Sequence, residues 1–318
     1  MADDLPERMG ALLINQRGVL TRVQALGGGM TDKAIVARLR SGRWQRLQLG
    51  VYAAFNGEPP RPSLLWAAVL RGGPGAVLSH QTAAELAGLV TTPEPLIHLT
   101  VPSGAQIARI PGVVVHYSGR LAQARHPVLE PARTRIEETV LDLGQAARAL
   151  DPALGWIFLA CGSRRTTAER IAAAMALRSK LRWRGDLAIA LDVAREGVHS
   201  LLEFRYLNRV ERPHGLPAGT RQHPVRRAGR RQYQDVLYEV FGVVVELDGR
   251  TAHPEQFRLR DVRRDNANVA VGQVTLRYTW ADVTGHPCAV AAEVSAALIR
   301  RGWTGAPRRC GRHCALPP

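Results

Sequence analysis

The stretch YQDVLYEVFGVVVELDG, residues 233–249, decides the fold of the second half of this chain. It predicts two strands, YQDVLY and GVVVELD, joined by the short turn EVF. The run VVVE is β-branched and apolar, which indicates a buried central strand. Asp235 lies on the first strand, and Glu246 and Asp248 end the second.

Carboxylates at the end of a buried strand need a compensating positive charge. Mg²⁺ can provide it, because this ion binds one or two carboxylates together with waters and substrate phosphates. Asp235, Glu246 and Asp248 are therefore predicted metal ligands, with Mg²⁺ or Mn²⁺ as the cofactor. The alternative is that the three acids are solvated at the strand end or paired with arginine.

The elements around the hairpin extend the same domain in both directions. Upstream, Ser200 precedes an amphipathic helix with Glu203 near its start, and TRQHPVRR is a predicted strand. Downstream come a loop with His253, an Arg- and Asp-rich helix, the strand TLRYTW and a last helix. The order helix, three antiparallel strands, helix, strand, helix predicts an α/β layer with a small mixed sheet.

In order and spacing, these motifs resemble the Vsr-like group of the PD-(D/E)XK nuclease superfamily over about residues 197–284. The resemblance implies a restriction-endonuclease-like fold that hydrolyses a DNA phosphodiester with a metal-activated water. The catalytic residues it implies are Glu203, Asp235, Glu246, Asp248 and His253.

One position departs from the superfamily pattern. The pattern has lysine two residues after the second acid, where this chain has Asp248. The cationic role of that lysine would then fall to His253, Arg264 or Arg277. A non-catalytic regulator that uses the nuclease fold only for binding is the alternative function.

The charge balance points to an acidic polymer as partner. Lys and Arg number 43 against 27 Asp and Glu, a formal net charge of +16, which favours a nucleic acid. The segment RRAGRR, residues 226–231, is a predicted hairpin turn at Gly229 with four arginines. We predict that these arginines bind DNA phosphates, with a solvated loop as the alternative: Arg226, Arg227, Arg230 and Arg231.

The first 56 residues follow the order of a winged helix-turn-helix. A helix over 5–16 is followed by a short helix capped by Thr21, a helix capped by Thr31, and two strands around Gly50. The second of the capped helices would be the recognition helix. The predicted DNA-binding residues here are Lys33, Arg38 and Arg40 on that helix and Arg43 and Arg46 in the wing; Arg264 is a further candidate in the C-terminal half. A protein-interaction module is the alternative.

The element order and the phrase GVYAAF resemble the N-terminal domain of AbiEi-type antitoxins. The resemblance continues through LLWAAVLRGGPGAVLSHQTAAELAGL and covers roughly residues 5–150. It implies a winged helix with an α/β extension, and a cognate toxin as a candidate partner beside DNA.

Together these patterns predict an α+β, multidomain chain. The expected parts are a winged helix-turn-helix (1–56), an AbiEi-like α/β extension (57–150), a helical connector (151–196), a Vsr-like endonuclease domain (197–302) and a basic, disordered tail (303–318).

Three histidines of the α/β extension, His80, His98 and His116, lack the sequence spacing of a metal site. We interpret them as ordinary, partly buried side chains.

The tail carries a second group of potential ligands. Cys310, His313 and Cys314 can ligate zinc, and His286 and Cys288 are candidates to join them. No second ligand pair stands at a recognisable finger spacing, so a disordered tail is the favoured prediction.

No stretch has the roughly 18 apolar residues of a transmembrane helix. The start, MADDLPERMG, is acidic and has no apolar core, which argues against a signal peptide. Four cysteines in 318 residues do not make a disulfide framework. We expect a cytoplasmic protein without membrane contact, and the sequence does not indicate its oligomeric state.

Overall fold

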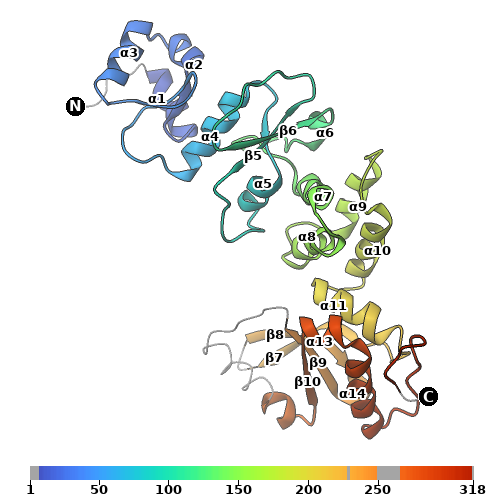
Figure 1. Cartoon of the computed structure of the whole chain (residues 1–318). Coiled ribbons are helices and arrows are strands. Elements are labelled where there is room, and N and C mark those ends of the chain that lie inside the picture. Colours follow the sequence, from blue (N-terminus) through green and yellow to red (C-terminus); the bar gives the residue numbers. More distant parts are fainter. Residues whose placement is uncertain (1–6, 228–229, 249–265, 317–318) are drawn as a thin grey trace. The chain divides into compact units, whose positions relative to one another are not determined.

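The protein is a mixed α/β chain with three small sheets and many helices in the part that the structure describes (Figure 1). The structure is a computed structural model, and it describes residues 7–227, 230–248 and 266–316. The chain divides into two compact units. The first unit is Met1–Ala146 with Ala174–Ser179, and the second is Ala147–Ala173 with Lys180–Pro318.

The N-terminal part of the first unit has the predicted winged-helix order. Thr21 and Thr31 begin their helices as predicted, since each hydroxyl accepts a hydrogen bond from the backbone N–H three residues on. Three short strands pair antiparallel in the order β1-β3-β2 around buried Trp44 and Tyr52. The elements are α1 (Glu7–Asn15), β1 (Val19–Thr21), α2 (Arg22–Gly27), α3 (Asp32–Arg40), β2 (Gln45–Gln48) and β3 (Val51–Ala53).

A second small sheet completes the first unit. Its order is β4-β5-β6, with β5 parallel to β6 and antiparallel to β4. Leu78, Leu99 and Val101 of β4 and β5 are fully buried in the core that this sheet forms with α4. The elements are α4 (Arg61–Gly72), β4 (Val77–Leu78), α5 (His80–Leu86), β5 (Ile97–Pro102), β6 (Val113–Ser118), α6 (Leu121–Ala124) and α7 (Ile136–Ala146).

The predicted connector is all-helical, as expected from its sequence, and its residues divide between the two units. Its helices are α8 (Leu150–Gly162), α9 (Ala168–Ala176) and α10 (Arg184–Arg195). Helices α8 and α10 belong to the second unit and pack on each other. Residues 174–179 belong to the first unit, where Arg178 forms ion pairs with Glu138 and Asp142 of α7.

The rest of the second unit has the predicted small mixed sheet, in the order β10-β9-β8-β7. Strands β7, β8 and β9 are antiparallel, and β10 is parallel to β9. The run 243–245 is fully buried, which confirms β9 as a central strand. The elements are α11 (Leu201–Tyr206), the π-helical turn η1 (Leu207–Glu211), β7 (Thr220–Arg227), β8 (Arg230–Tyr238), the turn η2 (Glu239–Phe241), β9 (Val243–Asp248), β10 (Val274–Thr279), α13 (Trp280–Gly285) and α14 (Pro287–Arg300), with helical residues also at 266–270.

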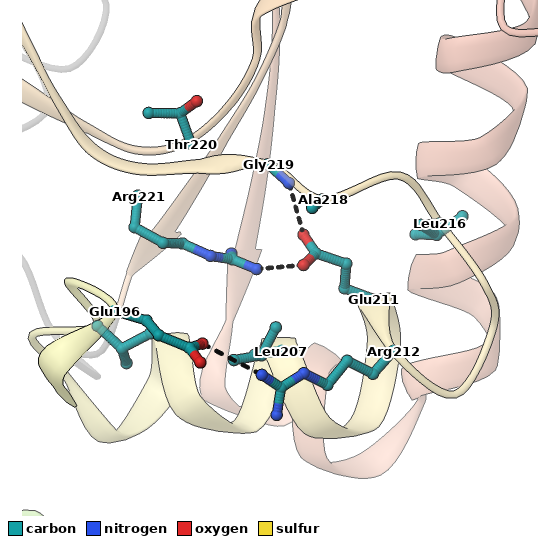
Figure 2. A pocket seen from close by; sticks show the side chains of 10 residues that line it. Glu196, Leu207, Glu211, Arg212, Leu216, Ala218, Gly219, Thr220 and Arg221 are labelled. Atoms are coloured by element: carbon teal, nitrogen blue, oxygen red, sulfur yellow. Dashed lines mark hydrogen bonds and ion pairs between the residues drawn. The ribbon is translucent and has the colours of Figure 1, made fainter. Parts of the chain in front are cut away.

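A buried ion pair fixes the start of β7 against η1. Figure 2 shows Arg221 of β7 directed at the Glu211 carboxylate, which also accepts the Gly219 N–H. The Tyr238 hydroxyl donates to the same carboxylate at 3.0 Å, and the hydroxyl oxygens of Tyr206 and Tyr238 lie 2.8 Å apart. Burial raises the pKa of Glu211, and the Arg221 charge opposes that shift. The pair therefore holds in place the strand that carries the next residue, Gln222.

We predict that Arg221→Met destabilises the second unit by about 3–5 kcal/mol, because it leaves Glu211 as a buried charge without its cation. The matched control is Arg212→Met. Arg212 and Arg221 line one pocket (Figure 2), but the ion pair of Arg212 with Glu196 is about half exposed on both sides. We therefore expect Arg212→Met to lower the free energy of unfolding by about 1 kcal/mol or less. Urea unfolding of the full chain measures both. Equal losses in the two variants would contradict the prediction.

Candidate functional site

The predicted acids lie on one face of the sheet. Val236 of β8 pairs with Val245 of β9, so Asp235 and Glu246 are the next residues to face each other. Asp248 lies two residues beyond Glu246 and therefore points to the same face. The spacing in the quoted hairpin thus gathers the three carboxylates at one end of two neighbouring strands.

Glu203 reaches this face from the first turn of α11. Its helix begins at Ser200, whose hydroxyl accepts the Glu203 N–H at 3.1 Å. One carboxylate oxygen of Glu203 accepts the His199 N–H at 3.1 Å, and the other accepts the Gln222 amide at 3.0 Å. The same Gln222 nitrogen donates to Asp235 at 3.2 Å. One amide therefore links the two carboxylates.

The environment of Glu203 favours its protonated form. Burial raises the pKa of Glu203 to about 7, and the negative charge of Asp235 adds to the effect, while the hydrogen bonds from His199, Ser200 and Gln222 oppose it. Glu203 and Glu246 are 3% and 4% exposed, so neither carboxylate has water as its main partner. A cation bound here would remove the repulsion that raises this pKa.

Gln222 is a member of this site that the sequence did not indicate. It lies on β7 between the pairs Arg221–Val236 and His223–Gln234, opposite Asp235. Its backbone has a φ of 47°, an uncommon conformation for a residue other than glycine and one that costs of order 1–3 kcal/mol. No sequence motif marks this position, because its role depends on the pairing of two strands.

Two of the acids also have partners within the protein. The Leu247 N–H donates to Asp235 at 2.8 Å. Arg277 of β10 lies beside Glu246 in the sheet register and donates to Asp248 at 3.3 Å. The Asp248–Arg277 pair places a guanidinium on the sheet face that carries the acids.

Two groups of three or more histidine, cysteine or acidic side chains within the described residues have donor atoms that all lie within 4.8 Å of one another. They are His214, Cys288, Cys310 and Cys314, and His80, His98 and His116. The four predicted acids do not form a third such group among the described residues: Glu203, Asp235, Glu246 and Asp248. The predicted Mg²⁺ site therefore requires these carboxylates to move closer together on binding, and it stays a prediction. His253 lies outside the described residues.

The strands on either side of the predicted arginine turn pair with each other. Arg226 pairs with Arg231 and Arg227 with Arg230 across β7 and β8. Arg226 and Arg231 are exposed, and the Arg231 guanidinium lies 5.4 Å from the centre of the Tyr233 ring. The turn at Gly229 and the candidate Arg264 lie outside the described residues.

Most of the basic side chains predicted to bind DNA in the first 56 residues are on the surface. Lys33 and Arg40 of α3, and Arg43 and Arg46 in or next to the wing, are exposed. Arg38 is half-buried, with its guanidinium 5.9 Å from the centre of the Trp44 ring, so it also supports the core of this subdomain.

Three histidines of the first unit, His80, His98 and His116, form one cluster, although the sequence shows no common motif for them. The rings of His80 and His116 stack with centres 3.7 Å apart, and His98 Nδ1 lies 3.0 Å from His116 Nε2. Burial lowers the pKa of His80 to about 3 and that of His116 to about 4, with the neighbouring histidine charges as the next cause. Sequence spacing could not reveal the cluster, because α5, β5 and β6 contribute one residue each.

No protein-family model matches the chain, and no curated protein matches it. Among solved structures, the chain is similar to the RV2827C protein from Mycobacterium tuberculosis, with 16% sequence identity and a TM-score of 0.39. The similarity covers 58% of this chain and 76% of that one, and it is a distant likeness of fold. In the described residues, no helix combines the length and apolar character needed to cross a membrane.

We predict that the first unit loses stability as the pH falls from about 6.5 toward 4. The unfolded chain binds protons on His80 and His116 near pH 6.5, whereas the folded cluster resists protonation until about pH 4 for His116 and about pH 3 for His80. The stabilisation is therefore complete above pH 6.5 and is lost in acid. We expect less than about 1 kcal/mol per pH unit from each histidine, because solvent partly screens the cluster.

Thermal unfolding of the full chain between pH 7.5 and 4.5 measures this dependence. His116→Phe should flatten it, because phenylalanine retains a stacking ring and does not titrate. His313→Phe, a change at an exposed residue of the second unit, is the control and should leave the slope unchanged. A wild-type slope in His116→Phe would contradict the assignment.

Proposed function

We propose that the protein is a DNA-associated endonuclease that hydrolyses phosphodiester bonds with Mg²⁺ or Mn²⁺ held by Glu203, Asp235 and Glu246. The observation that carries the proposal is the link through Gln222 between buried Glu203 and half-buried Asp235, with the pKa of Glu203 raised to about 7. Two carboxylates that share one hydrogen-bond donor, one of them buried, are a poor arrangement for stability alone. They are a suitable arrangement for a divalent cation.

The donor set fits magnesium better than a softer metal, because all of its atoms are carboxylate oxygens. When bound, the ion would activate a water and offset charge on the phosphate. Asp235 and Glu246 would hold it from neighbouring strands. Glu203, from the first turn of α11, would complete the ligand set in its ionised form.

Arg277 supplies the cation that the missing lysine would otherwise provide. Its guanidinium is held beside Asp248 on the face that carries the acids. From there it would stabilise negative charge developing on the phosphate oxygens. The sheet order, with β10 parallel to central β9, supports the Vsr-like assignment suggested by the sequence.

Targeting to DNA is assigned to the basic surfaces. The exposed cations of the winged helix and of the arginine hairpin, together with the net charge of +16, favour phosphate contacts. The winged-helix order also supports the AbiEi-like assignment of the first unit.

The second candidate is a non-catalytic, antitoxin-like regulator that binds DNA and a cognate toxin. It is favoured by the partners that Asp235 and Asp248 already have, the Leu247 N–H and the Arg277 guanidinium. In that case the acids would serve to fasten β8, β9 and β10 together.

Incubation of the full chain with supercoiled plasmid and Mg²⁺ or Mn²⁺ separates the two candidates. We expect the wild type to nick or linearise the plasmid, and Asp235→Asn to reduce the rate by at least about 10²-fold through loss of a metal ligand. Glu196→Gln, a change at an exposed acid away from the sheet face, is the matched control and should retain the activity.

A gel shift in EDTA shows whether each variant still binds DNA. Asp235→Asn should bind as the wild type does, and Arg40→Ala should bind more weakly with a shallower salt dependence. Equal cleavage by the wild type and Asp235→Asn would refute the nuclease. Salt-dependent binding without cleavage would favour the regulator.

A further inference from the structure

We propose that His214, Cys288, Cys310 and Cys314 form a structural zinc site that fastens the C-terminal segment to the rest of the second unit. This site is separate from the sheet face with the acids and does not depend on the proposed nuclease activity. Its ligands come from three places far apart in the sequence: the loop after η1, the first turn of α14 and the segment after α14.

The imidazole of His214 is oriented for a metal. Its Nδ1 lies 2.8 Å from the Val210 carbonyl, so Nδ1 carries the hydrogen and donates it. This leaves the lone pair of Nε2 facing the cysteines. The residue is fully buried, and Nε2 has no hydrogen-bond partner. An unsatisfied buried acceptor costs about 1–3 kcal/mol, and metal-binding histidines commonly use their other nitrogen in this way.

Cys288 and Cys310 lie at about the separation of two sulfurs on one tetrahedral metal ion. The sulfurs of Cys288 and Cys310 are 3.6 Å apart. A disulfide requires about 2.05 Å. Two thiolates on one tetrahedral zinc, each bonded at about 2.3 Å, stand about 3.8 Å apart. The fourth ligand, Cys314, is 7% exposed, so the site is partly shielded from water.

Three thiolates and one imidazole select zinc over magnesium. Soft sulfur ligands suit zinc, whereas Mg²⁺ requires oxygen atoms. Four protein ligands also leave no open coordination position, which is the arrangement of a structural rather than a catalytic zinc.

The segment after α14 is held where such a site needs it, although the sequence predicted a disordered tail. The Arg308 N–H donates to the His214 carbonyl at 2.8 Å, and its guanidinium donates to the Arg212 carbonyl at 2.9 Å. Arg309 donates to the Cys314 carbonyl at 3.2 Å. His313, a potential ligand in the sequence, is exposed and is not a member of the group.

The test is the zinc content of the full chain, purified under reducing conditions after growth with added zinc and measured by mass spectrometry. We expect about one zinc per chain. Reconstitution of the metal-free chain with Co²⁺ should give the visible absorption of a tetrahedral, thiolate-rich site. This second measurement needs no variant, so it holds even where a substitution impairs folding.

Two variants and two controls assign the ligands. Cys310→Ser and His214→Gln should each weaken zinc affinity at least about tenfold in competition with a chelator. Cys310 is exposed, so its substitution leaves the core intact. The two controls should retain zinc. Cys161→Ser removes the cysteine that is not a proposed ligand, and His313→Gln removes the histidine next to Cys314.

Three results would overturn the proposal. One is a wild-type chain without zinc and without the Co²⁺ spectrum. Another is a Cys288–Cys310 disulfide in place of the metal. The third is an equal loss of zinc in Cys161→Ser and Cys310→Ser, which would mean adventitious binding.

Discussion

The amide of Gln222 holds the half-buried carboxylate of Asp235 close to the carboxylate of Glu203, which is almost fully shielded from water. Burial and the charge of Asp235 both disfavour the ionised form of Glu203, and its pKa rises to about 7. A protein under selection for stability alone would gain by replacing such a pair with apolar side chains. Its presence on a sheet face with two more acids is the main reason to assign a cation and a reaction to this site.

Much of the second unit serves to keep that arrangement in place. The buried Glu211–Arg221 pair anchors the start of β7 and thereby the residue next to it, Gln222. On the other side, Arg277 of β10 holds Asp248. The proposed zinc site would add a third constraint, because it fastens the loop after η1 to α14. If both proposals hold, the unit combines hard oxygen donors for magnesium with a separate set of soft donors for zinc.

The sequence predicted local features better than it predicted contacts between distant segments. Alternation and β-branched runs indicated the buried central strand, and Thr21 and Thr31 marked helix starts because a capping hydroxyl acts within three residues. The order of elements around the hairpin also predicted the mixed sheet. By contrast, the bridge made by Gln222 and the ligand role of His214 arise only when separate segments pack together.

The same distinction applies to two further parts of the chain. The histidines at 80, 98 and 116 look unrelated in the sequence, because a motif search recognises only residues at short, fixed spacings. Three different elements bring these side chains together in the fold. The basic, proline- and glycine-containing segment after α14 has the composition of a disordered tail. Its anchor is the Arg308 backbone and side chain on the loop that contains His214, and this contact has no local signature.

The pH dependence of Mg²⁺ affinity, measured by calorimetric titration of the full chain, tests the central claim most directly. A proton on Glu203 competes with the ion, so affinity should rise about tenfold between pH 6 and pH 8 as the group with a pKa about 7 ionises. In Glu203→Gln this rise should disappear. Absence of Mg²⁺ binding, or the same affinity at both pH values in the wild type, would contradict the assignment of these acids as a metal site.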